Sequence, residues 1–127
     1  MSASKWKPYL NYTESNFDFI PQYPSHWELK RMQWIGKFSA SGIDKKSVET
    51  ESDCLMVNYT DVYGNETAEI HSNQEFMKTT ATSQKIAEHH LKKGDILFTP
   101  SSETTDDIGV SAVAMEDMKE TVYSYHL

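Results

Sequence analysis

The sequence predicts an α+β domain built mainly on a twisted, antiparallel β-sheet with one or two short helices. Several short apolar runs are separated by turn-forming residues, and only one stretch has the boundaries of a helix. The chain has 127 residues, which are enough to enclose one hydrophobic core but not two. We therefore expect a single domain over residues 18–127, preceded by an N-terminal arm over residues 1–17.

The N-terminal part predicts extended chain followed by a strand. Residues 1–25 are rich in Tyr, Asn, Ser and Pro and have no clean period. In "FIPQYPSHW" each proline disfavours helix at the residue before it. The segment around Trp27 and Leu29 then alternates between apolar and charged side chains, which indicates a strand, and this pattern breaks at Met32.

The middle part predicts a hairpin or a strand with a polar extension. The apolar run Cys54–Val57 continues into the more polar Asn58–Tyr63. Gly64 and Asn65 follow, a pair suited to the positive φ of a tight turn. We therefore expect the polar residues after Val57 to continue the strand.

The second half predicts a short helix and three strands. The helix lies in "TTATSQKIAEHHLKKGD", with Ser83 as N-cap, good helix formers through Glu88 and Gly94 near the end. The loops "PSSETTDDIG" and "MEDMKE" separate the strands that follow, which are Ile96–Thr99, Val110–Ala114 and Thr121–Leu127. The final "TVYSYHL" alternates like a strand in mid-course, so it is either an edge strand or part of something longer, and we expect a domain that is incomplete at its C-terminus.

Composition and cysteine usage favour a cytoplasmic location. Apolar residues make up 38% and charged residues 24%, as in globular proteins. No apolar run approaches the roughly 18 residues that cross a bilayer, and the start "MSASKWKPYL" is too polar for a signal peptide. Cys54 is the only cysteine, so no internal disulfide can form. We expect no contact with a membrane.

Charge is unevenly distributed along the chain. The formal net charge is −7, from 12 Lys and Arg against 19 Asp and Glu. Residues 1–50 have a balance of +2, and residues 51–127 have a balance of −9. Bulk charge therefore disfavours a domain that holds phosphates by attraction alone, so contact with nucleic acid needs local chemistry or partner subunits.

The motifs of a self-contained enzyme are missing. The sequence has no glycine-rich phosphate loop, no dinucleotide fingerprint and no adjacent prolines of the kind that an amino methyltransferase needs. Ser101 and Ser102 lack the flanking glycines that expose a nucleophilic serine. We expect this chain to have no catalytic residues and no cofactor.

Two patterns are compatible with a metal but have simpler explanations. Asp18 precedes Glu28 and Lys30 in an order that could hold Mg²⁺ in a nuclease, although the polar face of a strand produces the same pattern. His89 and His90 would point about 100° apart on a helix, so they converge poorly on zinc and are typical of a solvated helix end. We expect no metal site.

The loop "PSSETTDDIG" is the most informative polar segment. At about ten residues it is longer than a usual hairpin connection, and such loops are often functional. Its hydroxyls can meet phosphates or base edges, and Glu103 can accept a hydrogen bond from cytosine N4 in the major groove. Alternatively, Ser101, Thr104 and Asp106 only satisfy the backbone groups of a turn. Composition leaves both interpretations open.

Four separated blocks of the sequence resemble the specificity subunit of type I restriction and modification systems. They are "IPQYPSHWELKRMQWIGKFSASGIDKKS", "VNYTDVYGN", "KKGDILFTPSSETTDDIGVSAV" and "VYSYHL". In order and spacing, over about residues 18–127, they resemble one target recognition domain of that family.

The resemblance implies a reader of DNA without chemistry of its own. In that family the specificity subunit carries two recognition domains joined by long helices, and each reads one half of a split site in double-stranded DNA. Modification subunits bind S-adenosylmethionine and methylate adenine, and a restriction subunit uses ATP to translocate and cut. S-adenosylmethionine, ATP and Mg²⁺ are accordingly expected on partner subunits only.

The resemblance also implies which residues contact DNA. The base-reading candidates are Ser101, Ser102, Glu103, Thr104 and Thr105 in one polar loop, with Asn58, Tyr59, Thr60, Asp61 and Tyr63 as a second group. Each good base contact is worth about 1 to 3 kcal/mol. The phosphate candidates are Lys37, Lys45 and Lys46, which would position the domain without specifying sequence. A proline common in the family is replaced by Thr105, which would loosen the loop.

The chain differs from the family in lacking the spacer helices and a second recognition domain. Because its surface is acidic, we expect it to bind DNA weakly without partner subunits. Two other functions stay open. The first is a truncated subunit that acts as a protein interaction module, binds modification subunits and modulates restriction, and the second is a small metal nuclease.

Overall fold

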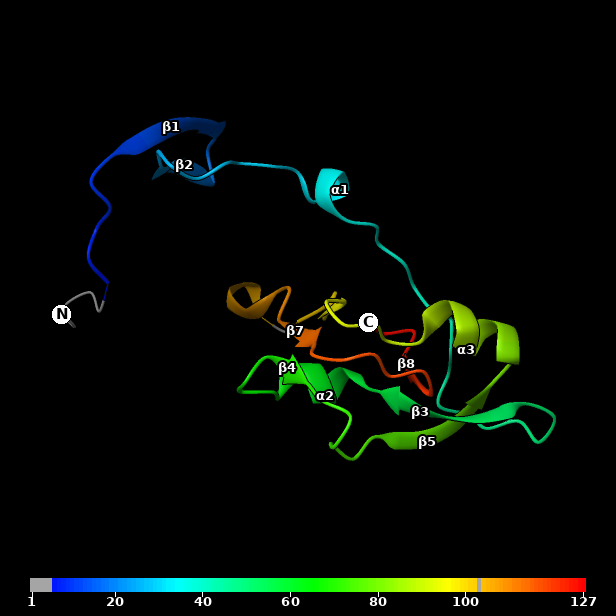
Figure 1. The fold of residues 1–127 in the computed structure, drawn as a ribbon. Helices are drawn as coiled ribbons and strands as arrows, with labels where there is room; N and C mark the ends of the chain where they lie inside the picture. The colour runs from blue at the N-terminus through cyan, green and yellow to red at the C-terminus, as the bar shows by residue number, and fades with distance from the viewer. Residues whose placement is uncertain (1–5, 103) are drawn as a thin grey trace. The chain divides into compact units, whose positions relative to one another are not determined.

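The computed structural model describes residues 6–102 and 104–127, and the chain divides into two units, Met1–Phe38 and Ser39–Leu127. In chain order the elements, labelled in Figure 1, are β1 (Tyr12–Phe17), β2 (Ile20–Pro24), α1 (Met32–Ile35), β3 (Ser52–Val57), α2 (Tyr59–Tyr63), β4 (Glu69–Ile70), β5 (Met77–Ala81), α3 (Ser83–His89), β6 (Ile96–Phe98), the 3₁₀ turn η1 (Thr105–Asp107), β7 (Ser111–Ala114) and β8 (Thr121–Tyr123).

The predicted α+β class is confirmed. Among the described residues, three of the five strand pairings are antiparallel, and three short α-helices are present where one or two were predicted.

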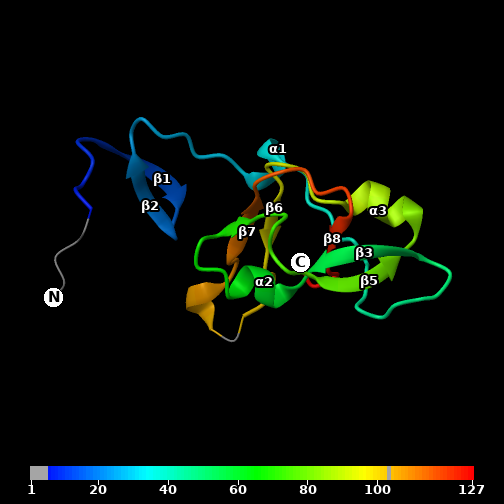
Figure 2. The ribbon, with the colours of Figure 1, turned by 60° about the horizontal axis from the view of Figure 1, so that its bottom comes forward.

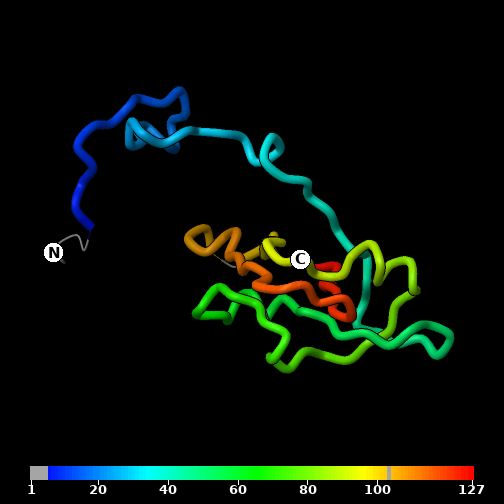
Figure 3. The backbone as a smooth tube through the Cα atoms, in the orientation of Figure 1, coloured from blue at the N-terminus to red at the C-terminus, as the bar shows by residue number. Residues whose placement is uncertain are grey.

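The unit Met1–Phe38 contains a β-hairpin and one helical turn joined by extended chain, as the blue to cyan part of Figure 3 shows. Strands β1 and β2 pair antiparallel, with Tyr12 opposite Pro24 and Phe17 opposite Ile20. Strand β2 contains both prolines of "IPQYP", in agreement with their bias toward extended backbone. The functional division into an arm at residues 1–17 and a recognition domain at 18–127 stays a prediction.

The strand predicted around Trp27 and Leu29 is wrong. The Trp27 amide donates to the Pro24 carbonyl at 2.9 Å, and this turn leads the chain out of the hairpin. Trp27 is 53% and Leu29 40% exposed. An alternating pattern becomes a strand only where a neighbouring strand and a covering layer support it. Neither is present around this segment within the described residues of its unit, and the single turn α1 follows it.

Strand β3 forms the centre of the unit Ser39–Leu127. It pairs antiparallel with β5 and in parallel with β8. Because neighbouring residues of a strand face opposite sides, the fully buried Met56 and Val57 enter different hydrophobic clusters. The smaller cluster contains Ile43, Cys54, Met56, Ala81 and Val122, and the larger contains Val57, Val62, Ile70, Leu91, Leu97, Ala112, Ala114, Met118 and Tyr123. Strands β3 and β8 therefore separate the two clusters.

A second three-stranded sheet, in the order β4-β7-β6, encloses the larger cluster, and Figure 2 shows it beside α2. Ile70 of β4 lies opposite Ala114 of β7, and Ile96 of β6 lies opposite Val113. The three strands predicted in the second half are present with shorter bounds, and β8 ends at Tyr123. No helix within the described residues has the length and apolar character needed to cross a bilayer.

The segment after Val57 is a helix, so the predicted polar strand extension is wrong. The Asp61 carboxylate accepts a hydrogen bond from the Asn58 amide at 2.7 Å, which satisfies a donor at the start of α2. Val62 is fully buried in the larger cluster. As a helix, this segment buries only the apolar side chain of Val62. As a strand continuing from Val57, it would turn every second residue toward the core, and most of those residues are polar.

Helix α3 lies where the sequence predicted it, but its N-cap is Thr82 and not Ser83. The Thr82 hydroxyl oxygen accepts from the Lys85 amide at 3.2 Å. Threonine and serine are both favoured at this position, so the local pattern could not separate the two. The prediction of a solvated helix end is also wrong for His89, which is partly buried and whose Nδ1 lies 3.1 Å from the Tyr123 hydroxyl.

Ile70 and Ile96 provide a matched test of where the stability of the second unit resides. Both flank β7, but Ile70 is fully buried and Ile96 is 53% exposed. We expect Ile70→Ala to lower the free energy of unfolding by about 2 to 5 kcal/mol, because it leaves a cavity in the larger cluster. Ile96→Ala should cost less than about 1 kcal/mol. Denaturant unfolding followed by circular dichroism measures both, and equal costs would contradict this account of the core.

Candidate nucleic-acid interface

Helix α2 presents two aromatic rings on one side. Tyr59 and Tyr63 lie one helical turn apart, and their rings stack with centroids 5.4 Å apart and planes inclined by 20°. Val62 of the same helix is fully buried and anchors it in the core. Tyr63 is 44% exposed, so the tyrosine side of α2 reaches the surface.

The loop between β6 and β7 is closed at its base by one residue. Thr99 is fully buried, and both its amide, at 2.9 Å, and its hydroxyl, at 3.0 Å, donate to the Val110 carbonyl. Gly109 has φ +77°, a backbone conformation that other residues rarely adopt. These contacts hold the two ends of the loop together.

The Asp107 carboxylate is the common hydrogen-bond acceptor for three hydroxyl groups of this region. It accepts hydrogen bonds from the Tyr63, Ser102 and Thr104 hydroxyls, the last at 2.8 Å. The Tyr59 hydroxyl donates to the Ser101 carbonyl at 2.8 Å. Two segments, joined by hydrogen bonds between residues 42 and 44 positions apart, therefore form one surface, which we call the α2–loop surface and define as residues 59–63 together with 101, 102 and 104–107.

The hydrogen bonds to Asp107 change its acidity. The Tyr63 hydroxyl, followed by the Thr104 hydroxyl, lowers the pKa of Asp107 below its ordinary value. The carboxylate therefore stays charged at neutral pH and keeps the donors of the loop directed toward it. Because the folded pKa is the lower one, the contribution of these bonds to stability is present above the unfolded pKa and is lost as pH falls through the folded pKa.

The structure joins part of the predicted site and separates the rest. The Tyr59 hydroxyl donates to the Ser101 carbonyl, and the hydroxyls of Tyr63, Ser102 and Thr104 share the Asp107 carboxylate. The α2–loop surface thus contains members of both groups of base-reading candidates.

Five base-reading candidates are not among these residues. Thr60 and Thr105 are exposed on the α2–loop surface. Asn58 and Asp61 are half-buried and bond to each other at the start of α2. Glu103 lies outside the described residues. Of the four described side chains among these five, those of Thr60 and Thr105 are open to an outside molecule.

The lysine candidates do not gather at this surface. Lys45 and Lys46 are exposed in the connection before β3, and Figures 1 and 2 place that connection at the opposite end of the second unit from η1. Lys37 is exposed in the other unit, Met1–Phe38. Contacts from these three residues to phosphate stay predictions.

Asp107 is the residue of this site that sequence reasoning missed. It follows Thr104 by three positions, the spacing at which a hydroxyl and a carboxylate meet around a tight turn. The spacing between Thr104 and Asp107 was the sequence feature from which a contact between them could have been predicted. The turn interpretation of the loop accounts for one contact, since the Thr104 amide donates to the Ser102 hydroxyl oxygen at 3.2 Å, but the other hydroxyl bonds converge on a carboxylate.

The metal patterns have other roles within the described residues. Glu28 and Lys30 form an exposed ion pair at 2.6 Å. His90 directs Nδ1 at the Ile86 and Ala87 carbonyls at 3.2 and 3.0 Å, so this nitrogen carries the proton. No group of three or more His, Cys, Asp or Glu side chains that could hold a metal ion occurs in the part of the chain that the structure describes.

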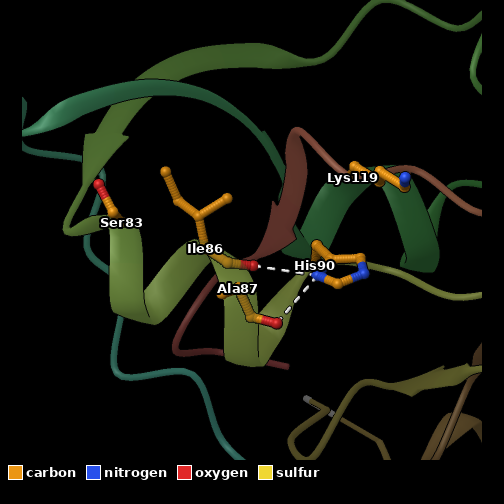
Figure 4. Close-up of a pocket in the computed structure, with 5 residues that line it drawn as sticks. All are labelled: Ser83, Ile86, Ala87, His90 and Lys119. Carbon is orange, nitrogen blue, oxygen red and sulfur yellow. Dashed lines mark hydrogen bonds between the residues drawn. The ribbon is translucent and has the colours of Figure 1, made fainter.

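Helix α3 borders a shallow groove with a volume of ≈ 380 Å³ (Figure 4). Ile86 and Ala87 form its apolar part, and Ser83, His90 and Lys119 provide polar groups. The lining residues include no carboxylate and no thiol, and His90 is held by the helix carbonyls. The groove is therefore mainly apolar, with polar groups at its border.

The acidity of Asp107 tests the α2–loop surface directly. We expect an Asp107 pKa below the ordinary value of about 3.9, measured by NMR titration of the carboxylate. Tyr63→Phe should raise this pKa toward the ordinary value, because it removes the leading hydrogen bond. Tyr59→Phe is the matched control, since its hydroxyl meets the Ser101 carbonyl instead. A pKa that both variants change equally would contradict the assignment.

No family model matches this chain, and neither a curated protein nor a solved structure matches it. The resemblance of its four blocks to a specificity subunit therefore stays a prediction. What the chain does is proposed from those blocks and from the geometry of the α2–loop surface.

Proposed function

We propose that this chain is a non-catalytic DNA-recognition domain of a type I restriction–modification specificity subunit. It reads one half of a bipartite target for adenine methylation and restriction by partner subunits. The observation that carries the proposal is the joining of helix α2 to the loop 101–107 through Tyr59 and Tyr63. Two polar segments that resemble reading loops, far apart in the sequence, form one surface.

Preorganisation supports a reading role for this surface. The loop is closed by Thr99, tied to α2 by two tyrosine hydroxyls and held internally by Asp107. A surface that is ordered before binding loses less conformational entropy when it meets DNA. The scaffold below it is rigid because Val62 and Val57 are fully buried in the larger cluster.

The chemistry of the surface favours particular base edges. Ser102 and Thr104 direct their hydroxyl hydrogens at Asp107. The Thr104 oxygen keeps its lone pairs for an outside donor, and the Ser102 oxygen, which accepts from the Thr104 amide, keeps one. Asp106 adds an exposed carboxylate. In the major groove the donors are the amino groups of cytosine N4 and adenine N6. The surface therefore favours a half-site that presents cytosine or adenine amino groups, with Thr60 and Thr105 as adaptable contacts.

Contacts to phosphate are divided between this chain and its partners. Carboxylates in the loop repel phosphates, and Lys45 and Lys46 lie at the other end of the unit. The subunits that bind S-adenosylmethionine and ATP would supply the basic surface beside the loop. We place the complex in the cytoplasm and the contacts from Lys37, Lys45 and Lys46 along the flanking backbone, where they position without specifying sequence.

Base reading is tested in a complex reconstituted with modification subunits and a randomised DNA library. Asp106→Asn and Thr105→Ala should change the preference at one base pair by roughly 5- to 100-fold, because one good base contact is worth about 1 to 3 kcal/mol. Affinity for unrelated DNA should stay within about twofold. Glu49→Gln, an exposed carboxylate outside the α2–loop surface, is the control. An equal change on every sequence would contradict a reading role.

A protein interaction module is the second candidate, and charge favours it. The unit Ser39–Leu127 carries 7 Lys against 16 Asp and Glu, a balance of −9, which matches a basic protein surface better than phosphate. In this role the chain would bind modification subunits and compete with complete specificity subunits, and so modulate restriction.

Capture of the chain by a purified modification subunit separates the two candidates. A DNA reader should be retained more strongly when DNA containing the selected half-site is added, because the DNA bridges both proteins. An interaction module should be retained equally without DNA and with any sequence. Asp106→Asn should reduce retention only in the first case.

A further inference from the structure

The Asp107 carboxylate fixes the direction of three hydroxyl hydrogens on the α2–loop surface. Its Oδ1 accepts from the Ser102 hydroxyl and, at 2.8 Å, from the Thr104 hydroxyl, and its Oδ2 accepts from the Tyr63 hydroxyl. The Tyr63 hydroxyl, followed by that of Thr104, lowers the pKa of Asp107, so the carboxylate stays ionised at neutral pH. An ionised carboxylate has no hydrogen to donate, and a hydroxyl has only one. All three hydroxyl hydrogens therefore point inward, toward Asp107.

The backbone of the loop is held by contacts that do not involve the Asp107 side chain. At its base, the amide and the hydroxyl of Thr99 both donate to the Val110 carbonyl. At its start, the Ser101 carbonyl accepts from the Tyr59 hydroxyl at 2.8 Å. A replacement of the Asp107 side chain should therefore change the direction of the hydroxyl hydrogens and leave the loop in place.

Thr104 is the loop residue on which this arrangement acts most clearly. It is exposed, and its hydroxyl donates to Asp107. Ser102 is half-buried, and its oxygen already accepts from the Thr104 amide at 3.2 Å. With its hydrogen directed inward, the Thr104 hydroxyl presents only lone pairs to an outside molecule. It therefore matches a hydrogen-bond donor of that molecule and not an acceptor.

This difference corresponds to a difference between bases. In the major groove, cytosine and adenine present the hydrogens of their N4 and N6 amino groups, whereas guanine and thymine present the carbonyl oxygens O6 and O4. A serine or threonine hydroxyl that rotates freely can bond to either kind of base edge. A hydroxyl whose hydrogen is directed at a carboxylate can accept only from an amino group.

We infer that Asp107 is the positioning residue that determines which bases the α2–loop surface accepts. It acts through the hydroxyls of Ser102, Thr104 and Tyr63, whose hydrogens it directs away from an outside molecule. The inference rests on the proposed DNA recognition and adds to it the residue that sets the preference for amino groups. Without the Asp107 carboxylate, the same hydroxyls would bond to amino and carbonyl edges alike.

Asp107→Asn reverses the arrangement for at least one hydroxyl. The amide has nearly the size of the carboxylate but replaces one acceptor oxygen by an NH₂ group, which donates. In one orientation of the amide this group faces Tyr63, and in the other it faces Ser102 and Thr104. In both cases at least one hydroxyl accepts from the amide and turns its hydrogen outward. That hydroxyl then matches a carbonyl oxygen of a base.

The base preference of the reconstituted complex tests the inference. Complexes of modification subunits with the unmodified chain or with Asp107→Asn select sites from a randomised DNA library. At one position of the half-site, the preferred base should change from cytosine or adenine to guanine or thymine, and the ratio of affinities should change by roughly 5- to 100-fold. Loss of one negative charge raises the affinity for every sequence alike, so it leaves this ratio unchanged.

Two variants are matched controls. Asp107→Glu keeps a carboxylate that only accepts, so cytosine or adenine should stay preferred even if the longer side chain lowers affinity for every sequence. Thr104→Val removes a hydroxyl and nearly keeps the shape of the side chain. It should reduce the preference at the position that Thr104 contacts and create none for guanine or thymine. Denaturant unfolding followed by circular dichroism checks that each variant is folded.

Three results would overturn the inference and leave the DNA-recognition proposal standing. The first is a base preference that Asp107→Asn leaves unchanged. The second is a preference that Asp107→Asn abolishes without reversing, because a merely structural role explains that result. The third is reversal by Asp107→Glu as well. By contrast, an unmodified complex with no base preference at any position would overturn the DNA-recognition proposal, and the inference with it.

Discussion

The parallel pairing of β3 with β8 is the contact on which the rest of the second unit depends. It brings the end of the chain against the strand that precedes α2, with Val57 opposite Tyr123. Met56 and Val122 fill one hydrophobic cluster, while Val57 and Tyr123 fill the other. Because both faces of these strands are buried, neither can slip by one residue without exposing its apolar side chains. The two clusters are therefore stabilised together.

This constraint places the candidate site. Helix α2 begins directly after β3, so the position of Val57 sets where Tyr59 and Tyr63 emerge. The loop after β6 reaches the same side because β7 returns beside β4 in the sheet that encloses the larger cluster. Asp107 then draws the hydroxyls of both segments toward one carboxylate. The result is an ordered surface of hydroxyl and carboxylate oxygens.

The two units differ in physical character, and the difference bears on function. The second buries two clusters and carries most of the negative charge, while the first exposes aromatic side chains beside basic ones. Exposed apolar area of this extent is typical of a docking surface.

The sequence by itself determined the α+β class, the helix ending in the histidines and the three strands that follow, because local periodicity and turn residues encode these features. It also identified both segments of the candidate site. Only the tertiary structure decided that the alternation around Trp27 and Leu29 is not a strand, because no neighbour supports one within its unit. Likewise, burial of Val62 turns a strand-like pattern into helix α2. The bond between Tyr63 and Asp107 joins residues 44 positions apart, and no local pattern can encode such a contact.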